Sequence, residues 1–204
     1  MWQGSSRSSP PGAEAPAGLP SATPHVLVKF SGTDVSPTVQ RWADLLVCEH
    51  LALQQAARLP GVAAATSRIL LQDGRTFLEV ERFNRHGDHG RSPLCTLETV
   101  NAAVHGDASP DWTVPARRLF SAGLLAEAGV AQVAHLWWFG RLIGPPRTFE
   151  PPLPLPPQRA TWQAASAAAL AFWHAAAEDA RISAGFRQLC AGHAARLRVV
   201  AEHA

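Results

Sequence analysis

The sequence predicts an α+β fold, in which a small β-sheet with one helix precedes an all-helical segment. Runs that favour β-strands are concentrated between residues 25 and 83, and helical patterns fill most of the chain from residue 96 onward. The 204 residues, 47% hydrophobic and 17% charged, are enough to bury a core in one domain or in two small lobes that share it. No apolar run approaches the roughly 18 residues of a membrane span.

The first 24 residues are mainly Ser, Pro, Gly and Ala. They offer too little apolar surface to offset the entropy of ordering, so we expect residues 1–24 to be disordered. They do not resemble a signal peptide, because no apolar run follows the early cation Arg7. Three widely separated cysteines (Cys48, Cys95 and Cys190) argue against a disulfide framework, which favours a cytoplasmic protein.

The predicted sheet is marked by local signals. Residues 25–30 are a short β-rich run between a proline and a Ser-Gly pair, which is typical of a buried strand. A helix is predicted to begin at the Ser36-Pro37 cap and to end near Arg58. Two β-rich runs within residues 66–83 flank Asp73-Gly74, a pair that predicts a tight hairpin.

The rest of the chain is predicted to be a polar loop, at residues 84–93, followed by helices. Residues 145–157 interrupt the helices as a linker with seven prolines, which we expect to be extended. The helices are predicted at Thr96–Val104, from a Ser109-Pro110 cap to about Ala122, at Ala126–Ile143, and as two Ala-rich helices near 158–178 and 183–202.

Lys29 is the only lysine in a chain whose other 17 basic residues are all arginine. Glu49, in the helix after the Lys29 strand, lies among mostly apolar residues and is therefore expected to have a partner. A cation held in place by a carboxylate is what a nucleotide phosphate site requires. A surface Lys29 and a solvent-facing Glu49 would give the same pattern, so both interpretations stay open.

Other patterns assign no chemistry. His86, Asp88 and His89, with the nearby Cys95, are residue types that bind zinc, but polar Gly-rich loops collect such residues freely, so we assign no metal site. No motif connects a Ser or Cys nucleophile to a histidine. The net charge is +2 and the basic residues form no block, so no direct nucleic-acid binding is expected.

Several runs of the chain follow one another as in a known family: Val26–Phe30, Arg41–Leu53, Ser67–Leu70, Arg75–Arg85 and Phe139–Gly144. Together they resemble the HipA family of serine/threonine kinases, closest to its YjjJ-like branch, and that family contains toxins of bacterial toxin–antitoxin pairs. The resemblance covers about residues 25–144 and resumes at about Phe149–Arg198. It implies a protein-kinase-like fold of the HipA type, with an N-lobe and hinge at 25–85 and a helical C-lobe at 86–204.

The resemblance also implies nucleotide-binding roles. Lys29 matches the lysine that contacts the phosphates of ATP, and Glu49 matches its partner on the helix. Glu81, Arg82 and Phe83 match the hinge, where backbone groups bind adenine. An ordinary edge strand with alternating polar residues would give the same hinge pattern.

The departures from the family concern its catalytic parts. Prolines lie among residues 8–18, where the family has a glycine-rich loop that cradles phosphate with backbone amides. The family's catalytic and metal-binding segments should follow Gly144, but the chain has no Tyr, and no Asp or Asn lies between Trp112 and Glu178. Mg²⁺ bound to ATP needs carboxylate or amide ligands. We therefore expect a truncated, internally deleted and inactive chain, with weak or vestigial ATP binding.

The sequence thus leaves two functions in competition. The first is a HipA-like, toxin–antitoxin-related kinase relative without catalysis. The alternative is an interaction protein that binds an antitoxin or a related kinase through its helical lobe. Loss of the segment after Gly144 would leave an apolar stripe and the faces of the Ala-rich final helices poorly covered, which favours this alternative. The same side chains packing the core would give the same pattern. That stripe comprises Leu136, Trp137, Trp138 and Phe139. An active kinase with unrecognised catalytic residues is a third, weaker hypothesis.

Overall fold

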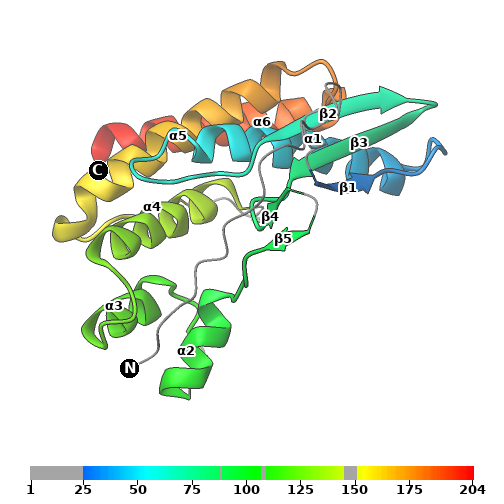
Figure 1. Ribbon diagram of the computed structural model, residues 1–204. Coiled ribbons are helices and arrows are strands. Elements are labelled where there is room, and N and C mark those ends of the chain that lie inside the picture. Colours follow the sequence, from blue (N-terminus) through cyan, green and yellow to red (C-terminus); the bar gives the residue numbers. More distant parts are fainter. Residues whose placement is uncertain (1–24, 88, 107–108, 145–150) are drawn as a thin grey trace, which may run out of the picture.

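A computed structural model describes residues 25–87, 89–106, 109–144 and 151–204 of the chain. It confirms the α+β class: a small antiparallel sheet comes first, and helices make up most of the rest (Figure 1). The expectations for residues 1–24, and for residues 145–150 of the proline-rich linker, lie outside the described residues.

Most predicted elements occur within a few residues of their expected bounds, with three corrections. The strand predicted to be buried at residues 25–30 lies at the edge of the sheet, and its large apolar side chains are 41–53% exposed. The predicted polar loop at 84–93 contains a pair of two-residue strands, β4 and β5. The helix predicted from Ser109 begins only at Thr113, because Asp111 Oδ1 accepts hydrogen bonds from Thr113 N and Oγ1. The elements are β1 (Val26–Phe30), α1 (Pro37–Ala56), β2 (Ser67–Gln72), β3 (Arg75–Glu81), β4 (Arg85–His86), β5 (Gly90–Arg91), α2 (Leu97–His105), α3 (Thr113–Ser121), α4 (Glu127–Ile143), the 3-10 turn η1 (Pro156–Gln158), α5 (Arg159–Glu178) and α6 (Ala184–His203).

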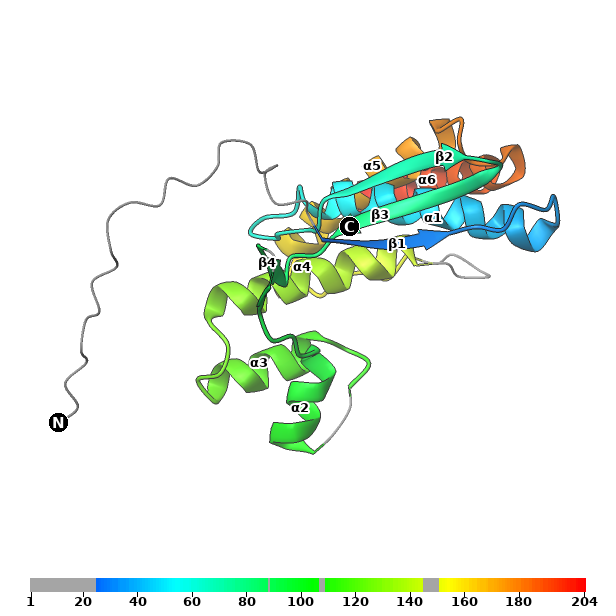
Figure 2. The ribbon, with the colours of Figure 1, turned by 45° about the vertical axis from the view of Figure 1, so that its right-hand side comes forward.

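The main sheet has three antiparallel strands in the order β1-β3-β2. Asp73 and Gly74 both have positive φ, 50° and 71°, which gives the tight β2–β3 turn that the sequence predicted. Leu78 in the central strand lies opposite both Lys29 of β1 and Ile69 of β2, and its side chain is fully buried. Helix α1 packs against one face of this sheet, as the turned view shows (Figure 2).

One hydrophobic core joins α1 to α4, α5 and α6. The predicted stripe on α4 is therefore not poorly covered: Trp138 and Phe139 are each 4% exposed, and Leu136 and Trp137 pack against the core. The reason is that α5 lies along α4, and Trp173 of α5 donates its indole N–H to the α4 carbonyl of Leu142 at 3.0 Å. The core includes side chains from both predicted segments, 25–85 and 86–204.

Helices α2 and α3 lie away from this core, at the lower end of the molecule in Figure 1. Helix α3 packs on α4, and α2 packs on α3. Among the described residues, no helix has the length and apolar character needed to cross a membrane.

Candidate functional site

Lys29 and Glu49 form an ion pair between β1 and α1. Lys29 Nζ donates to both carboxylate oxygens of Glu49, at 2.6 and 2.8 Å. Lys29 pairs with Leu78 in the ladder, and Leu78 is buried beneath α1, so both point to the helix side of the sheet. The helix is fixed at its start by Pro37 at N1 and by Ser36 Oγ, which accepts from Val39 N. The predicted pairing of Lys29 with Glu49 is confirmed.

The pair is accessible to a ligand. The side chains of Lys29 and Glu49 are 40% and 39% exposed. An ion pair whose side chains are this exposed to solvent contributes only about 0.2–1 kcal/mol to stability. The fold therefore depends little on the pair, and the ammonium group is open on one side to an anion.

The predicted hinge residues lie at the end of β3 and just beyond it. Arg82 N donates to His25 O at 2.8 Å, which holds this segment beside the start of β1. Phe83 is 70% exposed. Glu81 lies three residues from Leu78, the partner of Lys29, so the hinge and Lys29 are separated by about 10 Å along the strand direction.

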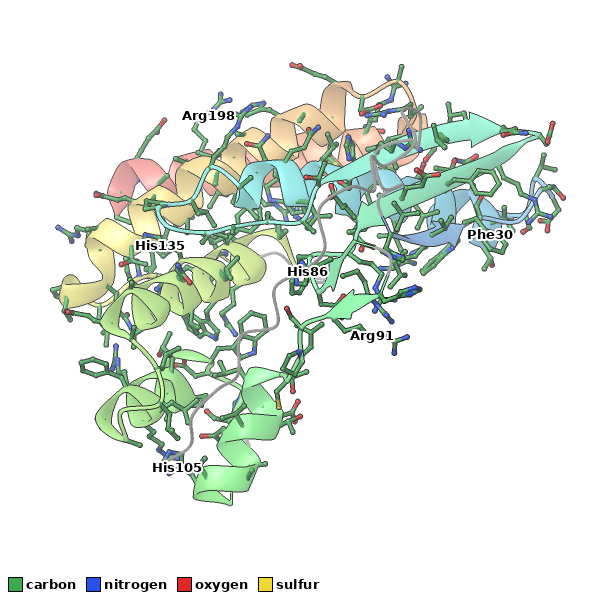
Figure 3. The ribbon with its side chains drawn as sticks, in the orientation of Figure 1. Phe30, His86, Arg91, His105, His135 and Arg198 are labelled. Atoms are coloured by element: carbon green, nitrogen blue, oxygen red, sulfur yellow. The ribbon has the colours of Figure 1, made fainter. Side chains whose placement is uncertain are left out.

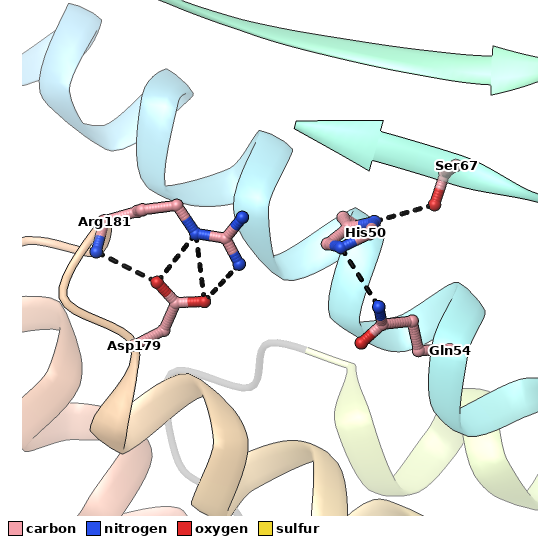
Figure 4. Close-up of polar contacts among 5 residues, drawn as sticks. All are labelled: His50, Gln54, Ser67, Asp179 and Arg181. Carbon is pink, nitrogen blue, oxygen red and sulfur yellow. Dashed lines mark hydrogen bonds and ion pairs between the residues drawn. The ribbon is translucent and has the colours of Figure 1, made fainter. Parts of the chain in front are cut away.

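A polar cluster that the sequence did not indicate lies between α1, β2 and the loop after α5 (Figure 4). His50 Nδ1 is 2.9 Å from Ser67 Oγ, and Gln54 Nε2 is 3.2 Å from His50 Nε2. Burial, reinforced by the positive charge of Arg181, lowers the pKa of His50. Hydrogen bonds from Arg181 lower the pKa of Asp179. The His50–Ser67 contact anchors α1 to the sheet, and no carboxylate of the described residues bonds to His50 to complete a Ser–His–acid arrangement.

Asp44 also has a role that spacing could not reveal. Its carboxylate, 2% exposed, accepts hydrogen bonds from Gln40 Nε2 and from both N and Oγ of Ser183. These contacts tie the start of α6 to α1. A cavity of about 620 Å³ lies beside them, lined by Leu45, Trp173 and other residues of α1, α5 and α6.

The zinc candidate does not assemble among the described residues. His86 Nε2 is 2.7 Å from Ser92 Oγ, and Cys95 is exposed. His86 lies on the short β4 strand, near the centre of the molecule in Figure 3. No group of three His, Cys, Asp or Glu side chains with metal-binding geometry occurs in the described ranges, and Asp88 lies outside them.

A second cavity, of about 600 Å³, lies between α2, α3 and α4. Its walls are mainly apolar and include Leu97, Trp112, Val133 and Leu136. Lys29, Glu49 and the hinge residues line neither of the two cavities. The ion pair and the hinge are therefore separate from both of these cavities.

Comparison with known proteins shows that the chain is similar to Toxin YjjJ of Escherichia coli (strain K12). The two are 31% identical over 226 residues, which cover 91% of this chain and 51% of that protein. The chain thus spans about half the length of the curated relative it matches. No protein-family model matches the sequence. No solved structure matches it either.

Proposed function

We propose that this chain is a HipA-like kinase relative, related to toxin–antitoxin systems, that binds nucleotide weakly and transfers no phosphate. The similarity to a protein named as a toxin supports the toxin–antitoxin relation. One structural observation carries the nucleotide part: Lys29 on a strand forms a bidentate ion pair with Glu49 on the next helix. Protein kinases use such a strand-to-helix Lys–Glu pair to hold the lysine at the ATP phosphates.

The hinge supports the same interpretation. Glu81 ends β3, the strand that pairs with the Lys29 strand, and Arg82 and Phe83 follow it. Their offset of about 10 Å from Lys29 is suited to adenine at one end of a nucleotide and phosphate at the other. Nucleotide binding here would use backbone groups at the hinge and a single cation at the phosphates.

The inactivity follows from what the sequence lacks. No Asp or Asn lies between Trp112 and Glu178, so residues 113–177 have neither the Asn nor the Asp ligands that kinases use for Mg²⁺. The match to Toxin YjjJ extends over 226 positions and the chain has only 204 residues, so at least 22 of those positions have no residue here. This supports an internal deletion.

Calorimetric titration with ATP tests the proposal. We expect a dissociation constant of about 1 mM, the same with and without Mg²⁺. Lys29→Met should abolish the binding heat. Arg68→Met is the matched control, because Arg68 is also a basic strand residue in an ion pair, with Glu79, but on the opposite face of the sheet. Micromolar binding that requires Mg²⁺, or transfer of labelled phosphate from ATP, would refute the proposal.

Partner binding through the helical segment is a second candidate, favoured by the apolar cavity between α2, α3 and α4. Trp112, which lines it, is 50% exposed. An antitoxin-type protein is the partner that the toxin similarity suggests. Co-purification with the product of a neighbouring reading frame tests this: Trp112→Ser should weaken it, and Leu124→Ser, an exposed apolar position that does not line the cavity, should not.

A further inference from the structure

The outer edge of β1 carries apolar side chains on both sides of the sheet. Six large side chains there are between 36% and 53% exposed, and we call them the edge patch. Leu27 points to the α1 side of the sheet, and Val28 and Phe30 point to the other side. Trp42 and Leu45, three residues apart on α1, extend the patch below the strand. The edge patch consists of Val26, Leu27, Val28, Phe30, Trp42 and Leu45.

The backbone of β1 also presents unpaired groups at this edge. Arg82 N donates to His25 O and Ser31 N donates to Thr76 O, so the odd-numbered residues of the strand bond to β3. The amide and carbonyl groups of Val26 and Val28 therefore point outward, where no strand of the described residues pairs with them. The outward carbonyl of Phe30 is bound by Trp42 Nε1 at 3.0 Å, which confirms its direction.

The opposite edge of the sheet differs in chemistry. β2 carries Arg68, whose side chain is 69% exposed, and ends in the polar Gln72. Charged side chains on an edge strand discourage pairing with another strand. The single charge of β1, Lys29, lies on the α1 side of the sheet and is paired with Glu49. Of the two edges, that of β1 is the more apolar, and its one charge is already paired.

We propose that two copies of this chain associate through antiparallel pairing of their β1 strands. With Val28 on the two-fold axis, Val28 of one copy faces Val28 of the other, and Val26 faces Phe30. In this register Val28 N donates to Val28 O of the other copy and Phe30 N donates to Val26 O, while Phe30 O stays bound to Trp42. Apolar side chains meet on the face away from α1, and Leu27 faces Lys29 on the α1 face. The two three-stranded sheets then form one continuous sheet of six strands.

A second copy suits this edge better than residues 1–24 do. Those residues contain five prolines, and proline has no amide hydrogen for a strand ladder. A second copy of β1 has no proline, and its one charged residue, Lys29, is paired with Glu49. In the proposed register Lys29 of each copy faces Leu27 of the other, so no charge stands directly opposite a like charge.

Sedimentation velocity over a range of concentrations tests the proposal. We expect the full chain to show a reversible monomer–dimer equilibrium. Val28→Lys should weaken it at least about tenfold, because two lysines would face each other across the axis. Leu71→Lys is the matched control: it places the same charge at a 62% exposed position on β2 and should leave the dimer unchanged. Circular dichroism checks that both variants fold.

Amide hydrogen exchange identifies the interface. In the dimer, the amides of Val28 and Phe30 should be protected although they point away from β3, and Val28→Lys should remove the protection. The proposal fails if the chain is monomeric at all concentrations, whether those amides exchange freely or are protected by the chain's own preceding residues. It also fails if Val28→Lys leaves the dimer intact, or if Leu71→Lys breaks it equally.

Discussion

Asp44 and Ser183 lie 139 residues apart in the sequence and are joined by two hydrogen bonds, from Ser183 N to Oδ1 at 2.8 Å and from Ser183 Oγ to Oδ2 at 2.6 Å. Ser183 is the N-cap residue of α6, and its own side chain makes no capping bond. The carboxylate of Asp44 thus supplies an acceptor and a negative charge at the start of that helix. This contact fixes the C-terminal helix to α1, the helix that also carries Glu49.

Asp44→Ala should destabilise the chain by about 1–3 kcal/mol, because it leaves the partly buried donors of Ser183 without their acceptor. Urea denaturation measures this effect: the midpoint should fall, and the dependence of the free energy of unfolding on urea concentration should stay the same. Asp73→Asn is the control, since Asp73 is exposed in the β2–β3 turn and Asn tolerates positive φ. If Asp44→Ala lowers the free energy of unfolding no more than Asp73→Asn does, water replaces the Asp44–Ser183 contact at little cost.

Acid should destabilise the fold below about pH 6.5 through two buried histidines. Burial lowers the pKa of His50, with a contribution from Arg181, and burial lowers that of His193, with a contribution from Arg196. The unfolded chain therefore binds more protons than the fold at mildly acid pH, so stability is full above the unfolded value of about 6.5 and decreases as the pH falls toward the lower folded pKa.

Urea midpoints at pH 7.5 and 5.5 measure this effect. His50→Gln should reduce the difference between the two midpoints, because the side chain can no longer gain a proton. His105→Gln, at an exposed position on α2, should leave the difference as in the parent chain. An identical difference in all three proteins would exclude His50 as its source.

The Lys29–Glu49 pair should matter little for stability. Both side chains are about 40% exposed, so solvent screens their attraction. Lys29→Met and Glu49→Gln should each change the free energy of unfolding by less than about 1 kcal/mol. Thermal unfolding without nucleotide checks this. A larger loss would mean that the pair supports the packing of α1 on the sheet, and loss of ATP binding in Lys29→Met could then reflect an altered fold.

Elements with local signals could be predicted from the sequence. The Ser36-Pro37 cap and the Asp73-Gly74 turn depend on residues within a few positions of each other, and both occur as expected. The partnership of Lys29 and Glu49 was predicted from the lone lysine and the family resemblance. Their nucleotide-binding role stays a prediction.

Contacts between distant segments could not be predicted. The partner of Asp44 lies 139 residues away, and no spacing rule connects the two. The burial of Trp138 and Phe139 was missed for a related reason: a missing segment shows which neighbours are lost, but not that α5 packs along α4 instead. Helix packing depends on the whole set of apolar faces, which no single run of residues defines.

Protection against hydrogen exchange should follow the packing of the helices. The main packing partner of helix α2 is α3, whereas α4 and α5 pack on each other and on α1. Segments with few buried contacts open at low free energy, and core helices open only with the whole fold. We expect α2 to exchange first and the amides of α4 and α5 to be as slow as those of α1. Trp173→Phe should speed exchange in α4, because it removes the indole donor to Leu142 O. Fast exchange of α4 in the parent chain would instead mean that its cover by α5 is only marginally stable.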